Sequence, residues 1–171
     1  MEGEPGERTP AAVLVAVVDR PSPTIILTER PTTMRRHPGQ ISFPGGRIDP
    51  DDAGPIEAAL REAQEEIGLA PDQVEVIGIA DRYVTITGFE VIPVIGVIPP
   101  GLPLVPHPHE VASMFEAPLH HLLDPRHHQI RSGEWRGRER PYFEIEWGGR
   151  RIWGATAAML VNLSRRLEPV A

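Results

Sequence analysis

The fold and chemistry of this chain are decided by the segment Arg61-Glu62-Ala63-Gln64-Glu65-Glu66-Ile67-Gly68-Leu69. On a helix its three glutamates stand at positions i, i+3 and i+4, so their carboxylates share one face. Like charges at this spacing repel by roughly 0.2–0.5 kcal/mol per pair even on an exposed helix. A divalent cation would offset that repulsion, and carboxylate oxygens suit Mg²⁺ or Mn²⁺ rather than zinc. On the helix alone, a solvated charged face is the favoured interpretation, and the glycine loop upstream is what turns the prediction to metal binding by Glu62, Glu65 and Glu66.

The flanking residues predict where this helix begins and ends. Pro55 suits a first helical turn, and Gly54 or Asp52 can cap it. Gly68 supplies the stop at the other end. Arg61 lies four residues before Glu65 and can hold that carboxylate by a charge-assisted hydrogen bond. The stripe predicted to be buried consists of Ile56, Ala59, Leu60, Ala63 and Ile67.

A segment rich in Arg, His, Gly and Pro precedes the helix. It runs from residue 29 to residue 52 without a clear period, about 24 residues, and a short strand is predicted at 40–43. Loops of that length are uncommon in compact domains unless they have a function. It includes Ser42-Phe43-Pro44-Gly45-Gly46, whose paired glycines allow the backbone to approach a ligand closely.

The rest of the chain predicts one domain over residues 11–168, after a flexible tail at 1–10. Residues 110–123 are expected to form a loop and a short helix, and residues 155–167 a closing amphipathic helix. The strands are predicted at 11–19, 24–28, 74–79, 82–87, 89–97, 142–147 and 150–153. The first two and the last two are expected to form hairpins, the second turning at Gly148-Gly149.

Composition excludes several classes of function. The chain has 171 residues, 40% of them hydrophobic, a net charge of −7 and no cysteine. The absence of cysteine excludes disulfides, a thiol nucleophile and a cysteine zinc site. The acidic balance argues against a general nucleic-acid binder, and no apolar stretch approaches the roughly 20 residues that span a bilayer. Without a visible secretory signal, a cytoplasmic location is expected. The pairs His120-His121 and His127-His128 point about 100° apart on a helix and are not expected to bind metal.

The segment from Gly46 to Leu69 resembles a Nudix box, which is Gly, a spacer, then Arg-Glu-hydrophobic-x-Glu-Glu-x-Gly-hydrophobic. The second half matches at every fixed position. The spacer is one residue longer than usual and lacks the usual glutamate. Asp52 falls at that position counting forward from Gly46, and Ala53 counting back from Arg61, so neither takes over its role.

A second motif narrows the resemblance. The segment Leu27 to Gly46, with Arg30, Arg35-Arg36-His37 and Gly45-Gly46, resembles the extra motif of the coenzyme A pyrophosphatase branch of that family. That branch shares the longer spacer. Similarity continues at Glu110-Val111 and at residues 153–157, so it covers nearly the whole chain from Ala11.

The resemblance implies a Nudix-type α/β/α sandwich with a mixed sheet. It implies Mg²⁺- or Mn²⁺-dependent hydrolysis of coenzyme A, or a derivative, to 3′,5′-ADP and 4′-phosphopantetheine or its acyl form. Glu62 and Glu66 would be direct metal ligands, and Glu65 would ligate or take the proton. Glu110 is the other candidate to assist the attacking water, with a position at a helix N-terminus as its alternative.

Substrate recognition is expected from the densest basic cluster, formed by Arg30, Arg35, Arg36 and His37, together with Gly45 and Gly46. Arginine forks suit a phosphate such as the 3′-phosphate of coenzyme A, although plain surface charge is the alternative. Two other functions stay open. One is a Nudix diphosphatase for ADP-ribose, a dinucleotide or a nucleoside triphosphate. The other is a non-catalytic nucleotide-binding module, against which the three retained glutamates argue.

Overall fold

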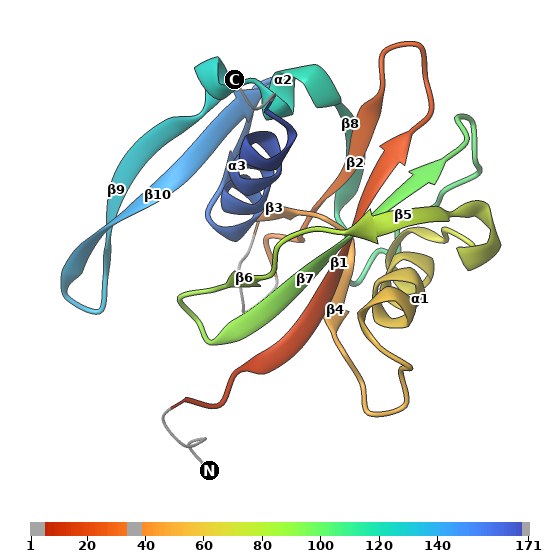
Figure 1. Ribbon diagram of the computed structural model, residues 1–171, viewed down its shortest axis with the longest axis horizontal. Helices are drawn as coiled ribbons and strands as arrows, with labels where there is room; N and C mark the ends of the chain where they lie inside the picture. The colour runs from red at the N-terminus through yellow and green to blue at the C-terminus, as the bar shows by residue number, and fades with distance from the viewer. Residues whose placement is uncertain (1–5, 34–38, 169–171) are drawn as a thin grey trace.

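Strand β1 (Thr9–Val18) is the centre of the structure, a computed structural model that describes residues 6–33 and 39–168 (Figure 1). Alternate β1 side chains enter two different cores. Ala12, Leu14 and Ala16 pack toward α1 (Pro55–Ile67). Ala11 and Val15 pack toward α3 (Ala155–Leu167) on the other face. Burial on both faces explains why this strand has a continuous apolar run instead of alternating polar and apolar residues.

The other strands of the main sheet are β2 (Thr24–Glu29), β3 (Ile41–Ser42), β4 (Gly45–Arg47), β5 (Glu75–Ile79), β6 (Tyr83–Val84), β7 (Phe89–Ile98) and β8 (Ser113–Pro118). Their order is β3-β2-β1-β7-β5, with β4 on β1, β6 on β7 and β8 on β2. β1 and β7 run parallel over the full length of β1. The remaining pairs within the described residues are antiparallel, so the sheet is mixed.

One edge of β1 is shared by two partners. Val17 and Val18 pair with β2, which confirms the first predicted hairpin, whereas residues 11–13 pair with β4. The short strand β4 therefore lies beside the first half of β1, against which α1 also packs. This arrangement brings the paired glycines of β4 next to the glutamate helix.

Helix α1 has the ends that the sequence predicts. It starts at Pro55 after Gly54, and Gly68 ends it in the left-handed conformation with φ 69°. Its buried side chains are Ala58, Ala59, Ala63 and Ile67, and the three alanines allow the helix axis to lie close to the sheet. The burial predicted for Ile56 is wrong: its side chain is 39% exposed, because the first turn projects beyond the sheet.

A second layer covers the opposite face of the sheet (Figure 1). It contains α3, the short helix α2 (Leu119–Leu123) and a three-stranded antiparallel sheet of β9 (Gln129–Trp135), β10 (Arg138–Trp147) and β11 (Arg150–Trp153). Ile145, Ile152 and Leu160 fill the core between them. The fold is thus an α/β/α sandwich, as predicted. Two 3₁₀ turns, Pro71–Gln73 and Pro125–His127, complete the secondary structure.

The predicted closing helix and the hairpin at Gly148-Gly149 are confirmed, but other predictions are wrong. Residues 113–118 form β8 and not loop or helix, because their backbone completes the edge of β2. Strand β9 was missed because it is mostly exposed and shows no apolar alternation. β1 starts at Thr9, within the segment expected to be a tail. Only Tyr83 and Val84 of the predicted strand 82–87 pair with β7.

No helix among the described residues has the length and apolar character needed to cross a bilayer.

Candidate active site

Two carboxylates of α1 point at the glycine backbone of β4. The Gly45 N–H donates a hydrogen bond of 3.3 Å to Glu66 Oε2. A Cβ at Gly46 would lie 2.6 Å from Glu62 Oε1, which is inside normal van der Waals separation. The sequence predicted that the backbone of these glycines can approach a ligand closely. In the structure it closely approaches the carboxylates of Glu62 and Glu66. A side chain at position 46 would push Glu62 away from its place.

Burial and crowding of negative charge raise the pKa values of both carboxyl groups. Burial, followed by the charge of Glu62, raises the pKa of Glu66 to about 8. Burial is also the largest cause of the raised pKa of Glu62; Arg61 acts in the opposite sense, and Glu65 and Glu110 add to the rise. Glu110 contributes to the rise in both pKa values, so its carboxylate lies within electrostatic range of the pair. A divalent cation would relieve this uncompensated charge.

Arg61 gathers carboxylates from the helix and from the loop before it. Its Nη1 lies 3.2 Å from both Glu62 Oε1 and Glu65 Oε1. On the loop side, its Nε and Nη2 bind the two oxygens of Asp52, each at 3.0 Å, and Nη2 also contacts Asp49 at 3.3 Å. These hydrogen bonds lower the pKa of Asp52 and raise that of Arg61.

Asp52 was not assigned to the site from the sequence, and the structure shows what it does. Its side chain is 4% exposed, and its Oδ2 accepts the Asp49 N–H at 2.8 Å in addition to Arg61. Asp52 and Ala53 were the two residues that could stand at the position of the missing spacer glutamate. Asp52 is the one that contacts the helix, through Arg61. The signal in the sequence was the acidic residue at the forward count from Gly46.

Glu65 and Glu110 differ in their surroundings. The expected contact of Glu65 with Arg61 is present: both its oxygens lie within 3.3 Å of Nη1, and its side chain is 51% exposed. It therefore turns toward Arg61, whose Nη1 it shares with Glu62. Glu110 lies in a turn, its N–H donating to His107 O at 3.0 Å. Its carboxylate has no ion-pair partner among residues 6–33 and 39–168. The interpretation of Glu110 as a helix cap is wrong, because the following element is strand β8.

The turn that carries Glu110 is attached to the end of α1. Val105 N–H donates to Ile67 O at 3.0 Å, and His107 N–H donates to Glu66 O at 2.7 Å. These bonds satisfy two carbonyls that the last helical turn leaves without partners. The backbone thereby holds Glu110 and the glutamate pair together.

Arg30 lies at the opposite side of the same site. Its main chain closes the base of the loop, donating to Gln40 O at 2.9 Å and accepting from Gly39 N–H at 3.2 Å. Its charge opposes the rise in the pKa of Glu66, so the guanidinium lies near that carboxylate. Its Nε is buried and has no hydrogen-bond partner within the described part of the chain. The other predicted members of the cluster, Arg35, Arg36 and His37, lie outside the described residues.

No group of three or more histidine, aspartate or glutamate side chains is assembled for a metal ion among the described residues. The residues nevertheless fit a divalent cation, because Glu62 and Glu66 are partly buried, lie against the β4 backbone and repel each other. The histidines do not offer an alternative. The rings of His121, His127 and His128 each contact a main-chain carbonyl.

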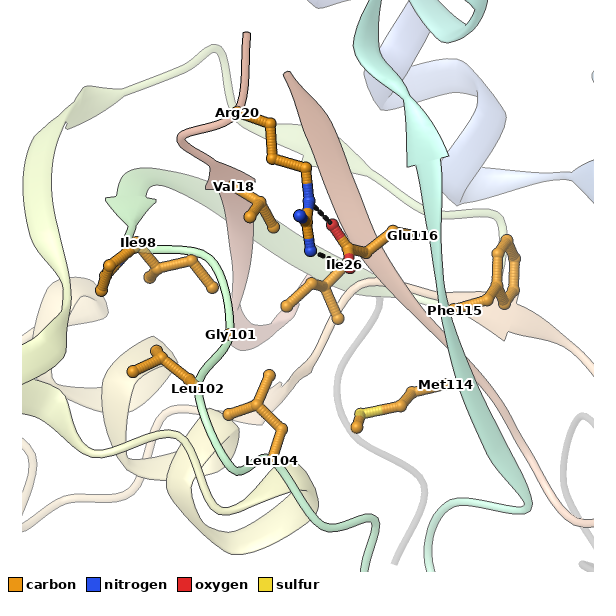
Figure 2. A pocket seen from close by; sticks show the side chains of 11 residues that line it. Val18, Arg20, Ile26, Ile98, Gly101, Leu102, Leu104, Met114, Phe115 and Glu116 are labelled. Carbon is orange, nitrogen blue, oxygen red and sulfur yellow. Dashed lines mark hydrogen bonds and ion pairs between the residues drawn. The ribbon is translucent and has the colours of Figure 1, made fainter. Parts of the chain in front are cut away.

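Two pockets were not predicted. The smaller, with a volume of about 290 Å³, lies on the α1 side of the sheet (Figure 2). Its walls are mainly aliphatic, with Met114 and Phe115 contributed by β8. Its one arginine, Arg20, binds Glu116 through two hydrogen bonds of 2.9 and 3.1 Å. That pairing leaves no uncompensated positive charge for a phosphate. The larger, about 860 Å³, lies between the turn after β6, the β9–β10 hairpin and α3.

Comparison with known proteins agrees with this fold and site. The model of the Nudix domain family matches residues 8–140. The uncharacterized Nudix hydrolase NudL of Cronobacter sakazakii is 43% identical over 169 residues, covering 92% of this chain and 82% of the relative. NudL of Citrobacter koseri is 42% identical over 175 residues, covering 98% and 87%. The chain therefore belongs to the Nudix family. It is a pyrophosphatase, a hydrolase of diphosphate bonds in small nucleotide substrates, in a family that generally uses divalent metal ions.

Solved structures show the same fold. The Nudix hydrolase RenU of M. smegmatis superimposes with a TM-score of 0.57 at 25% identity, covering 69% of this chain and 75% of RenU. The Ap4A hydrolase of C. elegans gives a TM-score of 0.56 at 19% identity, covering 64% and 80%. At this identity the second likeness shows the fold alone.

The contacts of Asp52 predict that Asp52→Asn impairs the site. Each Asp52 oxygen accepts from Arg61, so the amide NH₂ of asparagine would face a donor in either orientation. We expect kcat/KM for a diphosphate substrate to fall by about 10–100-fold, with a higher Mg²⁺ concentration needed for half-maximal rate. Asp51→Asn, at an exposed neighbouring position, is the control. Wild-type kinetics in Asp52→Asn would show that this contact does not support catalysis.

Proposed function

We propose that this Nudix hydrolase cleaves the diphosphate of coenzyme A, or of an acyl or oxidised derivative. The products are 3′,5′-ADP and 4′-phosphopantetheine or its acyl form. The proposal rests on the resemblance of the segment from Arg30 to Gly46 to the coenzyme A branch, and on where the two ends of that segment lie.

The observation that carries the proposal is that both ends of this segment act on the same carboxylate, the first through the charge of Arg30 and the second through a hydrogen bond from Gly45. At its start, the Arg30 guanidinium lies near Glu66, with a buried Nε that has no partner in the described structure. At its end, Gly45 N–H donates to Glu66. The buried Arg30 Nε, which lacks a partner in the described structure, is suited to an anionic ligand, and a guanidinium suits phosphate oxygens. The segment that resembles the branch motif thus borders the expected position of the diphosphate.

In this proposal Glu62 and Glu66 hold Mg²⁺ or Mn²⁺, and Glu65 is a further ligand or stays on Arg61. When bound, the metal supplies charge neutralisation of the diphosphate and activation of the attacking water. Arg61 keeps Glu62 and Glu65 in position and joins them to Asp52. Arg30 donates to the substrate, which lowers the cost of the negative charge that develops on the phosphate oxygens.

Glu110 is proposed to accept the proton of the attacking water. The water oxygen forms a bond to one phosphorus, and the bond from that phosphorus to the bridging oxygen breaks. The electron pair of the broken bond stays on the bridging oxygen, which leaves as part of the second phosphate. The water proton goes to the Glu110 carboxylate. Glu65 is the alternative acceptor, but both its oxygens are held by Arg61.

A substrate panel tests the proposal directly. Coenzyme A, acetyl-coenzyme A, ADP-ribose and NADH are compared at equal concentrations with Mg²⁺ and with Mn²⁺, with product analysis by chromatography. The highest kcat/KM is expected for coenzyme A or its acyl form. A clear preference for ADP-ribose or a dinucleotide would refute the proposal while leaving diphosphate hydrolysis intact.

The metal assignment predicts a large effect of Glu66→Gln. Glutamine keeps an acceptor oxygen for Gly45 N–H but removes a charged ligand. We expect turnover to fall by more than about 100-fold, with thermal stability unchanged or raised because repulsion with Glu62 is removed. Glu57→Gln, at an exposed position in the first turn of the same helix, should retain full activity. Near-normal turnover of Glu66→Gln would contradict the assignment.

Recognition of the 3′-phosphate by the basic cluster predicts discrimination against dephospho-coenzyme A. A charge-assisted contact to a phosphate contributes about 1.5–3 kcal/mol. We therefore expect kcat/KM for dephospho-coenzyme A to be lower by at least about tenfold in the wild type. Arg35→Ala or Arg36→Ala should reduce the ratio of kcat/KM for coenzyme A to kcat/KM for dephospho-coenzyme A. Equal kcat/KM for both substrates would show that the 3′-phosphate is not recognised.

The assignment of Glu110 as proton acceptor predicts the behaviour of Glu110→Gln, which keeps the shape and removes the basicity. We expect kcat to fall by roughly 10²–10⁴, with an unchanged Mg²⁺ dependence. Glu75→Gln, at an exposed position on β5, is the control. Rescue of Glu110→Gln by high Mg²⁺ would instead identify Glu110 as a metal ligand, and normal kcat would assign the proton to another group.

A further inference from the structure

The larger pocket, called the hairpin cleft below, is an apolar site that the diphosphate chemistry does not use. Five large hydrophobic side chains that remain exposed in the folded chain line it: Val84, Ile86, Ile130, Trp135 and Trp153. Its volume of about 860 Å³ lies within the roughly 300–1,000 Å³ of ligand pockets. Exposed apolar side chains gathered around one concave surface indicate a binding site.

The net charge of the hairpin cleft disfavours phosphate as its occupant. Glu134 and Arg140 are the charged residues among those that line it, so the two charges offset each other. Its polar groups are otherwise neutral, such as the side chains of Gln40, Thr85 and Asn162. The cleft therefore suits an uncharged, mainly apolar group with a few hydrogen-bonding atoms.

The hairpin cleft is joined to the active site by Gln40. Its side chain lines the cleft, and its carbonyl accepts the N–H of Arg30, whose guanidinium lies near Glu66. The next residue, Ile41, accepts a hydrogen bond of 3.0 Å from the buried Thr156 hydroxyl. The loop that borders the glutamates is thus fixed to α3, which forms one wall of the cleft.

The shape of the lining favours a flexible chain over a planar base. A base stacks on the open face of an aromatic ring. Here the Tyr142 and Trp153 rings meet at 64° with centroids 5.7 Å apart, edge against face. The remaining apolar lining is mixed: Tyr83, Trp135 and Phe143 are aromatic, and aliphatic side chains such as those of Val84, Ile86 and Ala158 lie among them.

We infer that the hairpin cleft binds the uncharged pantetheine arm of the substrate and the acyl group attached to its thiol. This inference rests on the proposed function, since coenzyme A carries its phosphates in one half and this arm in the other. The diphosphate lies at Glu62 and Glu66, the arm follows the loop past Gln40, and the acyl chain packs against Ile86 and Ile130.

Two matched substitutions test this inference. Ile86→Asp introduces a charge into the cleft at a side chain that is 53% exposed, and Ile79→Asp introduces the same charge on β5, outside the cleft, at one that is 51% exposed. We expect Ile86→Asp to lower kcat/KM for octanoyl-coenzyme A at least about tenfold and coenzyme A less, because an ionised carboxylate is costly beside an acyl chain. Ile79→Asp should match the wild type. Equal kinetics of the two variants with octanoyl-coenzyme A would overturn the inference.

A binding measurement separates this inference from the proposed function. S-octanoyl-pantetheine lacks nucleotide and diphosphate, and Trp135 and Trp153 in the cleft report on its binding by fluorescence. Saturable binding to the wild type and to Ile79→Asp, weakened at least about tenfold in Ile86→Asp, is expected. No binding, or equal binding to Ile86→Asp, would refute the site even if coenzyme A is hydrolysed. Failure to hydrolyse coenzyme A with this binding intact would refute the proposed substrate instead.

A second copy of the chain is the other occupant to be tested, and light scattering after size exclusion measures whether the chain dimerises. The inference expects Ile86→Asp and the wild type to have the same molecular mass. A wild-type dimer that Ile86→Asp dissociates, with octanoyl-coenzyme A kinetics unchanged, would make the cleft an interface between copies and overturn the inference.

Discussion

The close approach of the β4 backbone to two carboxylates of α1 is the constraint on which the site depends. Gly45 donates to Glu66, and Gly46 leaves no space for a Cβ beside Glu62. The approach is possible because β1 shares one edge between β2 and β4, so that β4 reaches the helix that packs on the same strand. A side chain at position 46 would displace the Glu62 carboxylate, and one at position 45 would clash with the backbone of β1 at Ala12 and Val13.

Arg61 and Arg30 divide the charge of the site between them. Arg61 binds Asp52 most closely, through Nε and Nη2 at 3.0 Å, and reaches Glu62 and Glu65 through Nη1 at 3.2 Å. Arg30 lies near Glu66 and keeps an unpaired donor within the described structure. The helix is thus held to its preceding loop by one cation, while excess negative charge remains around Glu62 and Glu66. That excess is what makes a divalent cation favourable there.

Local signals in the sequence predicted the elements whose boundaries are set by single residues. Pro55 and Gly68 gave the ends of α1, and the hairpin at Gly148-Gly149 was equally local. Strand β8 was missed because its partner, β2, is distant in the chain, and strand β9 was missed because it is mostly exposed and shows no apolar alternation. The role of Asp52 was undetermined because two ways of counting the spacer disagreed. Two further features depend on tertiary packing, which no spacing in the sequence encodes. One is the position of Glu110 near the glutamate pair, and the other is the hairpin cleft.

The hydrogen bonds from Val105 and His107 to the last carbonyls of α1 have a consequence for how the enzyme prepares for reaction. The loop that carries Glu110 loses its conformational entropy when the domain folds, and not when the substrate arrives. The relative positions of the glutamate pair and Glu110 are therefore preorganised, so binding energy is not consumed in assembling them. An unfolding fluctuation of the final helical turn would release both groups together, so catalytic competence should be lost in one cooperative step and not gradually.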